Sequence, residues 1–219
     1  MVEMGWVSVV GAMLVVATMT AIFQWGVKKR WLLTEAQGPE NRKMAVGTIL
    51  CMAAVAGAAF LFHQYGYGFW KQMKYFVILC GVLLAAYADQ KERRIPNRFL
   101  LILCGIRVIL LTAEIIAWPA LWSDFLTHAL GGAVGSFLLM LAAWYLSRRS
   151  IGLGDVKLLT VTGSFLGFSL NYISLFLGLL FAAIYGVTRV LRKKIKIRDE
   201  IAFAPFLAAG VWAALLIGL

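Results

Sequence analysis

Two aspartates differ from the other acidic residues of this 219-residue sequence in the segments that surround them. Asp89 lies at the end of an apolar run, in the segment 88–97 that reads ADQKERRIPN. Asp155 lies just before another apolar run, in the segment 151–157 that reads IGLGDVK. Each acid therefore marks a junction between an apolar run and a short polar connection.

Two carboxylates held together near a membrane boundary do not both stay ionised, because repulsion and partial desolvation favour a proton on one of them. The ionised group can then take a proton from water while its protonated partner polarises a carbonyl group, which is chemistry suited to amide hydrolysis. We therefore name Asp89 and Asp155 as a candidate catalytic pair. Taken singly, such an acid is more often an interfacial cap or ion-pair partner, and that alternative stays open.

The segments around the two acids have distinct local signals. The helix that carries the first acid must end before Pro96, because proline disfavours helical geometry in the residue ahead of it. Asn97 can then cap the following helix. Beside the second acid, Gly152 and Gly154 allow backbone conformations or close approaches that other residues resist. An acid beside such bare backbone would be accessible to a peptide.

The composition indicates where these segments lie. Hydrophobic residues make up 62% of the chain and charged residues only 14%, with a mean hydropathy of +0.86. Soluble proteins carry about 25% charged residues. Here the charges fall in bursts between long apolar runs, which is typical of helices that each need about 20 residues to cross a bilayer. We expect an all-α polytopic membrane protein with eight transmembrane runs, at residues 4–27, 44–63, 75–89, 99–117, 125–146, 158–169, 171–188 and 201–219.

The basic residues predict the orientation. Most of the 21 Lys and Arg residues fall in the connections after the first, third, fifth and seventh runs. The positive-inside rule places those connections in the cytoplasm and both termini on the extracytoplasmic side. Both candidate acids then face the cytoplasm. The net charge of +11 follows the membrane segments, so we expect the lipid bilayer and not nucleic acid as its partner.

The domain organisation is expected to be simple. Residues 1–219 read as one integral membrane domain, with a less distinctive N-terminal helix pair at 1–74 and a six-helix core at 75–219. The sixth and seventh runs should form a hairpin, because basic clusters flank both ends of the stretch that contains them. The three cysteines form no CxxC pair, so no metal site is indicated, and we expect no cofactor.

The motifs resemble those of a known family. Asp89 followed by RIPN at 94–97, and GLGDVK at 152–157, together resemble the type IV prepilin peptidases, which are membrane aspartic peptidases of the GxGD type. The APF segment at 204–206 is similar to that family's closing segment. The resemblance covers roughly residues 75–219. Presenilin-like peptidases share the Gly-x-Gly-Asp segment but not the other two features.

The resemblance implies a specific reaction and site. Asp89 and Asp155 would be the catalytic aspartates of an endopeptidase that removes the short basic leader of a prepilin or pseudopilin, at the cytoplasmic face of the inner (plasma) membrane. The glycines would shape the loop that holds the second acid, and the IPN segment would order the turn after the first. The implied site-shaping residues are Gly152, Gly154, Lys157, Ile95, Pro96 and Asn97.

One departure from the family pattern and one alternative function remain. Family members that also methylate the new N-terminus carry a larger insert after the first helix, usually with paired cysteines, whereas the connection 28–43 is short and has no cysteine. We therefore expect cleavage without N-methylation. The alternative is a small transporter or assembly factor that uses the same acids to bind ions or to pair with Arg107.

Arg107 is unusual because it lies near the middle of its apolar run. Glu114 follows seven positions later, about two helical turns, so the two side chains can share a face. Charge at that depth is costly and often functional. A structural partnership is nevertheless the favoured interpretation, because no motif of the family falls on Arg107.

Overall fold

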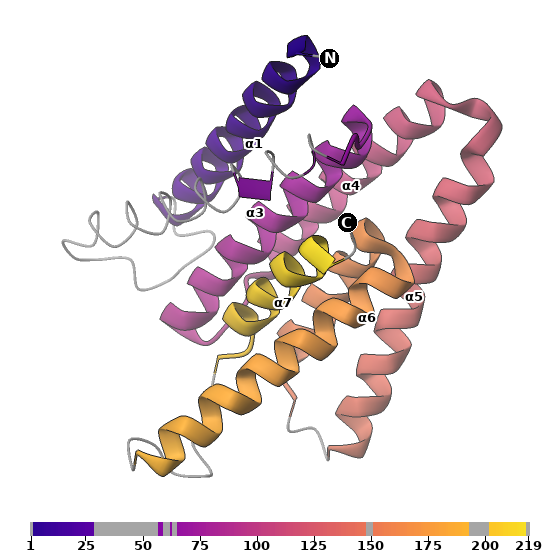
Figure 1. The fold of residues 1–219 in the computed structure, drawn as a ribbon. Helices are drawn as coiled ribbons and strands as arrows, with labels where there is room; N and C mark the ends of the chain where they lie inside the picture. Colours follow the sequence, from indigo (N-terminus) through magenta and orange to yellow (C-terminus); the bar gives the residue numbers. More distant parts are fainter. Residues whose placement is uncertain are drawn as a thin grey trace.

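A computed structural model of the chain describes residues 2–28, 57–58, 62, 65–147, 151–192 and 202–217. The regular elements in these ranges are all helices, which confirms the all-α prediction. The elements are α1 (Val2–Lys28), α3 (Phe69–Glu92), α4 (Asn97–Ala117), the 3-10 helix η1 (Pro119–Leu121), α5 (Trp122–Leu146), α6 (Leu153–Leu191) and α7 (Ala204–Ile217). They pack as a bundle in which α1 and α3 run in the same direction and α4 runs back beside α3 (Figure 1).

Four of the described helical segments are long and apolar enough to cross a membrane. They are α3, α4, the segment Pro119–Leu146 and α6, and two shorter apolar helices lie at Met13–Gln24 and in α7. These helices indicate a multi-pass membrane protein. The predicted run 44–63 lies outside the described residues except at 57–58 and 62. The number of crossings and the side of each terminus stay predictions.

Helix α3 occupies the centre of the bundle. In its most apolar window 78% of the residues are buried, against 28%, 22% and 17% in the windows of the other three long segments. It packs against α1, α4, α6 and α7. The other long helices expose large apolar side chains such as Ile109, Phe137 and Phe176, which suit contact with lipid tails. Of these four long segments, the one that carries Asp89 is therefore the most buried.

Helix α6 folds back on itself at Gly167, whose φ of 75° and ψ of −178° interrupt the helix. The Asn171 side chain donates to the carbonyl oxygen of Leu159 at 3.2 Å. Residues twelve positions apart in a straight helix would be separated by about 18 Å. The chain therefore reverses, as the orange ribbon shows in Figure 1 and as the sequence predicted. We call residues 153–166 the first arm of α6 and residues 168–191 its second arm.

The first arm packs closely against α5 through glycines. A Cβ atom added to Gly132 would contact the carbonyl oxygen of Gly163, and it would lie 2.7 Å from Cα of Gly167. Ser136, one turn further along α5, accepts a hydrogen bond of 2.6 Å from the Asn171 side chain. The two backbones thus meet without intervening side chains, as small residues permit in membrane helices.

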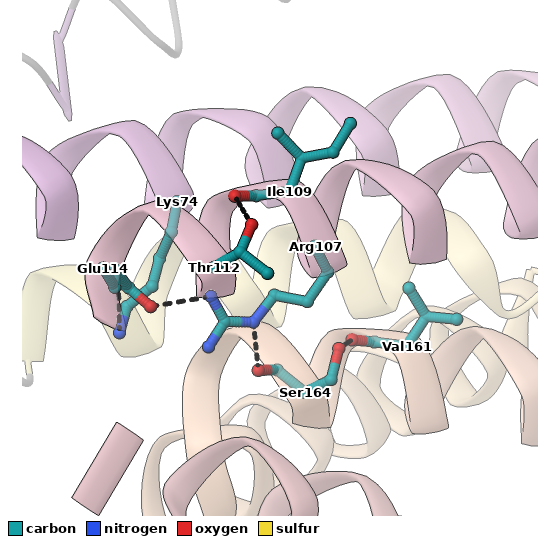
Figure 2. A network of polar contacts seen from close by, with 7 residues as sticks. All are labelled: Lys74, Arg107, Ile109, Thr112, Glu114, Val161 and Ser164. Atoms are coloured by element: carbon teal, nitrogen blue, oxygen red, sulfur yellow. Dashed lines mark hydrogen bonds and ion pairs between the residues drawn. The ribbon is translucent and has the colours of Figure 1, made fainter. Parts of the chain in front are cut away.

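A buried charged cluster joins α3, α4 and the first arm. Arg107 Nη1 lies 3.0 Å from Glu114 Oε2, which bears out the predicted shared face, and Lys74 Nζ lies 3.6 Å from Glu114 Oε1. Arg107 Nε donates to the Ser164 carbonyl oxygen at 2.8 Å (Figure 2). That carbonyl belongs to the last turn of the first arm, where helical donors run out. Arg107 therefore caps the arm while Glu114 balances its charge.

Candidate active site

Asp89 lies in the last turn of α3 and is only 7% exposed. The helix ends at Glu92, and Arg93 follows in a left-handed conformation with φ of 50°. The Arg93 N–H donates to the backbone oxygen of Asp89 at 2.9 Å. The helix thus ends ahead of Pro96, as predicted from the sequence. This termination leaves the Asp89 carboxylate at the end of the helix, facing the start of α7.

The Asp89 carboxylate is held by the backbone of α7. Its Oδ2 atom accepts a hydrogen bond of 3.1 Å from the N–H of Ala204, the first residue of that helix. Ala204 is fully buried. The N–H groups of a first helical turn have no partner within the helix, so a carboxylate is a natural acceptor for them.

Asp155 lies in the first turn of α6, three residues after the N-cap residue Gly152. It is partly buried, and its carboxylate lies beside the N-cap residue. A Cβ atom at Gly152 would lie 3.2 Å from Asp155 Oδ2, which is tighter than an ordinary contact. The charge of Asp89 acts on Asp155, so the two carboxylates are near enough to repel each other.

Both carboxylates line one cavity of about 780 Å³. Helix α5 and the second arm of α6 supply most of its apolar wall. Such a volume, with few polar groups in an apolar lining, is typical of ligand sites in proteins. The lining residues are Asp89, Arg93, Leu139, Met140, Ala142, Ala143, Leu146, Ile151, Gly152, Asp155, Leu175, Leu179, Ala202 and Phe203.

Of the six predicted site-shaping residues, only Gly152 lines the cavity. Four others connect the two acid-bearing segments behind it. A Cβ atom at Gly154 would lie 3.5 Å from Cβ of Ile95, and Lys157 Nζ donates to Asn97 Oδ1 at 3.0 Å. Pro96 is the N-cap residue of α4. These contacts join the turn after the first acid to the helix that carries the second.

One detail of the sequence interpretation is wrong, and of the two roles expected for the glycines only the close approach is found. Asn97 does not cap α4, because it is the first helical residue and no side-chain capping bond forms there. Its side chain instead accepts the bond from Lys157. The glycines also do not supply unusual backbone angles: Gly152 has φ of −66°, and Gly154 lies within the helix. Only the space beside Gly152 is needed, since a side chain there would crowd the Asp155 carboxylate.

The contribution of the 202–204 segment was missed by sequence reasoning. The APF segment was noted as a family feature, but no contact to Asp89 was assigned to it. A signal was present, because proline in the first turn marks a helix start and the free N–H groups there attract anions. The wall from α5 carries no comparable signal, since its apolar residues also suit lipid contact.

Comparison with known proteins shows to which family the chain belongs. The type IV leader peptidase family matches residues 76–187, just over half of the chain. The Bacillus subtilis (strain 168) prepilin leader peptidase/N-methyltransferase is 31% identical over 173 residues, which cover 76% of this chain and 65% of that protein. The Aeromonas salmonicida (strain A449) protein of the same name is 33% identical over 115 residues, which cover 46% of this chain and 40% of that protein.

A Stutzerimonas stutzeri prepilin leader peptidase/N-methyltransferase is 26% identical over 158 residues, which cover 69% of this chain and 52% of that protein. This chain thus spans less than two thirds of the length of these relatives. No solved structure gives a significant match. The range matched by the family includes both aspartates, and on this evidence the chain belongs to the type IV leader peptidase family.

Proposed function

We propose that this chain is a membrane aspartic endopeptidase that removes the short basic leader of type IV prepilins or pseudopilins. The observation that carries the proposal is that Asp89 and Asp155, 66 positions apart in the sequence, line the same cavity. Membership of the type IV leader peptidase family supports the same reaction.

The chemistry needs one ionised and one protonated carboxyl group. The ionised group takes a proton from water, whose oxygen then attacks the scissile carbonyl carbon, while the protonated group polarises the carbonyl oxygen. Repulsion between two adjacent carboxylates favours such a singly protonated pair. The cavity therefore has the groups that amide hydrolysis by an aspartic pair requires.

The apolar wall suits the proposed substrate. A prepilin continues beyond its leader into an apolar helix, so the peptidase must accept charged and apolar segments side by side. In the same cavity as the acids, α5 and the second arm of α6 present Leu139, Met140 and Leu175. The end of α3 and the starts of α6 and α7 meet at the acids, next to connections that are predicted to be cytoplasmic. We therefore propose cleavage at the cytoplasmic face of the inner membrane.

We further propose that cleavage proceeds without N-methylation. The relatives named above carry both activities in their names. In this chain the connection 28–43 is short and lacks cysteine, unlike the insert of methylating members. Transfer of a labelled methyl group from S-adenosylmethionine to a cleaved pilin by the purified protein would overturn this part of the proposal and leave the peptidase assignment intact.

The test of the peptidase is leader removal from candidate prepilins, followed by mass spectrometry after co-expression. Asp89→Asn and Asp155→Asn should each abolish cleavage. Asp124→Asn is the matched control, because Asp124 is an exposed acid in the first turn of α5 and does not line the cavity. Full cleavage by either cavity variant contradicts the mechanism.

The transporter or assembly-factor alternative makes a different prediction. It assigns the two acids to ion binding or to pairing with Arg107, but Arg107 pairs with Glu114. Loss of the cellular phenotype in Asp89→Asn with unchanged leader removal would favour that alternative over the peptidase.

A further inference from the structure

We propose that the two aspartates have fixed and different roles: Asp89 is the ionised base, Asp155 bears the proton, and the N–H of Ala204 enforces this order. The proposal rests on the peptidase function proposed above. It adds a positioning group, the first backbone amide of α7, that acts through Asp89 without touching the substrate.

The contact between Ala204 and Asp89 favours a charged acceptor. The distance from the Ala204 nitrogen to Asp89 Oδ2 is 3.1 Å, and the two residues are 0% and 7% exposed. A backbone N–H can only donate, and here it lies at the positive end of a 14-residue helix. The backbone of Phe203 adds a second favourable interaction. Donors to a carboxylate stabilise its ionised form.

Asp155 lacks comparable support. It also lies in the first turn of a helix, but that position gives only a weak preference for negative charge. Within the described residues no hydrogen bond reaches its carboxylate, and the charge of Asp89 acts against its ionisation. A single proton shared by the pair therefore resides on Asp155.

The other charged groups around the pair reinforce this order. Arg93 is the one further titratable residue in the cavity lining of the described structure, and its charge acts on Asp89. The lining residues from α5, from the second arm of α6 and from the two positions before α7 are all uncharged. Lys157, near Asp155 in the sequence, is engaged by Asn97. Among the described residues, the positive charge in the lining therefore acts on Asp89, whereas the charge that acts on Asp155 is the negative charge of Asp89.

The assignment gives a balanced reaction. Asp89 takes a proton from water as the water oxygen bonds to the scissile carbonyl carbon, and Asp155 gives its proton to the carbonyl oxygen. When the tetrahedral intermediate collapses, the C–N bond breaks, the proton on Asp89 passes to the leaving nitrogen, and Asp155 recovers its proton from the hydroxyl group. Both carboxyl groups return to their starting states without a cofactor.

Ala204→Pro tests the role of the amide, because proline removes the N–H and is tolerated at the first position of a helix. Phe203 accepts bonds from Phe206 and Leu207 as an N-cap residue, a position whose usual extended geometry a following proline also favours. The pH profile of kcat/KM should shift its acidic limb upward by about one pH unit, the worth of one bond to a charged group. The alkaline limb, which reports the proton on Asp155, should stay in place.

Ala204→Gly is the control, since it removes the methyl group and keeps the N–H; both limbs should match those of the wild type. An acidic limb that stays in place in Ala204→Pro, or a shift confined to the alkaline limb, overturns the assignment. If the wild-type protein still removes the leader, either of these results overturns the assignment of roles and leaves the peptidase proposal standing. The failure of one proposal can therefore be told from the failure of the other.

A second measurement applies even if Ala204→Pro does not fold. Infrared titration of the carboxyl bands in Asp155→Asn and Asp89→Asn reports the one remaining acid of the pair, after subtraction of the double variant. The acid left in Asp155→Asn should stay ionised to a lower pH than the acid left in Asp89→Asn. The opposite order, or equal titration, overturns the proposal whether or not a cleavable substrate has been found.

Discussion

The side chain of Asn171 donates to the Leu159 carbonyl oxygen at 3.2 Å, across the reversal of α6 at Gly167. The same side chain accepts a bond of 2.8 Å from Thr162 and donates one of 2.6 Å to Ser136 in α5. One fully buried amide therefore fastens both arms of the hairpin to each other and to the neighbouring helix. Asp155 begins the first arm that this amide holds in place.

Replacing this amide should destabilise the protein without touching the cavity. Asn171→Leu keeps a similar volume but removes all three bonds, and we expect a loss of about 1–3 kcal/mol in the free energy of unfolding. Thermal unfolding in detergent measures the loss. Ser174→Ala is the control, because this buried hydroxyl donates within its own helix, to the Leu170 carbonyl oxygen. Equal melting temperatures for the two variants would contradict the proposed fastening.

The contact between α5 and the first arm should tolerate no added methyl group. In Gly132→Ala the new Cβ would meet backbone atoms of Gly163 and Gly167, which cannot move separately from their helix. We expect a cost of about 1–3 kcal/mol in unfolding free energy, as for other overpacked sites. The adjacent Gly131→Ala adds a methyl group where nothing lies within 4 Å, so it should be neutral or slightly stabilising. Thermal unfolding of the two variants measures this difference, and equal melting temperatures would contradict the prediction.

The charged cluster should act in stability and not in catalysis. Among the described residues, Arg107→Met leaves the 3% exposed Glu114 with the longer contact to Lys74 as its remaining ion pair, and should cost about 3 kcal/mol. The double variant Arg107→Met/Glu114→Gln should recover part of this loss, because it removes the uncompensated negative charge. Cleavage per folded molecule should match the wild type in both variants. A specific loss of activity in well-folded Arg107→Met protein would assign the arginine a functional role.

The bond between Lys157 and Asn97 should affect activity more than stability. Lys157 is exposed, so Lys157→Met should change the melting temperature little. Its loss frees the turn after Asp89 from the helix that carries Asp155. We expect kcat/KM to fall about fivefold, the equivalent of one hydrogen bond of about 1 kcal/mol. The double variant with Asn97→Ala should be no slower than the single variant; additive losses would mean that the two residues act separately.

Features set by local sequence were predictable. Pro96 required the break between α3 and α4, and the seven-residue spacing of Arg107 and Glu114 placed both on one face of a helix. The reversal within α6 followed from the basic clusters that flank it. Each of these predictions needs only neighbouring residues and the rules of helix geometry or membrane orientation.

Features set by distant contacts were not predictable. The bond between Ala204 and Asp89 joins positions 115 apart in the sequence. Asn97 accepts a bond from Lys157 instead of capping α4, and these two residues are 60 positions apart. This contact depends on how α4 and α6 pack against each other. The lining from α5 depends on which face of an evenly apolar helix turns inward. A single sequence contains no local pattern that specifies such pairings.

The central position of α3 should make the depth of Asp89 independent of the thickness of the bilayer. A helix in contact with lipid tilts or shifts when the thickness of the hydrocarbon layer changes. Asp89 is carried by a helix whose neighbours are mostly protein, so its height relative to Asp155 is set by packing with α1, α6 and α7. Asp155 begins the first arm of α6, where Val156, Leu158 and Leu159 are buried in the same core, so protein packing also sets its depth. A thinner or thicker membrane should therefore move the exposed second arm before it changes the distance between the two carboxyl groups.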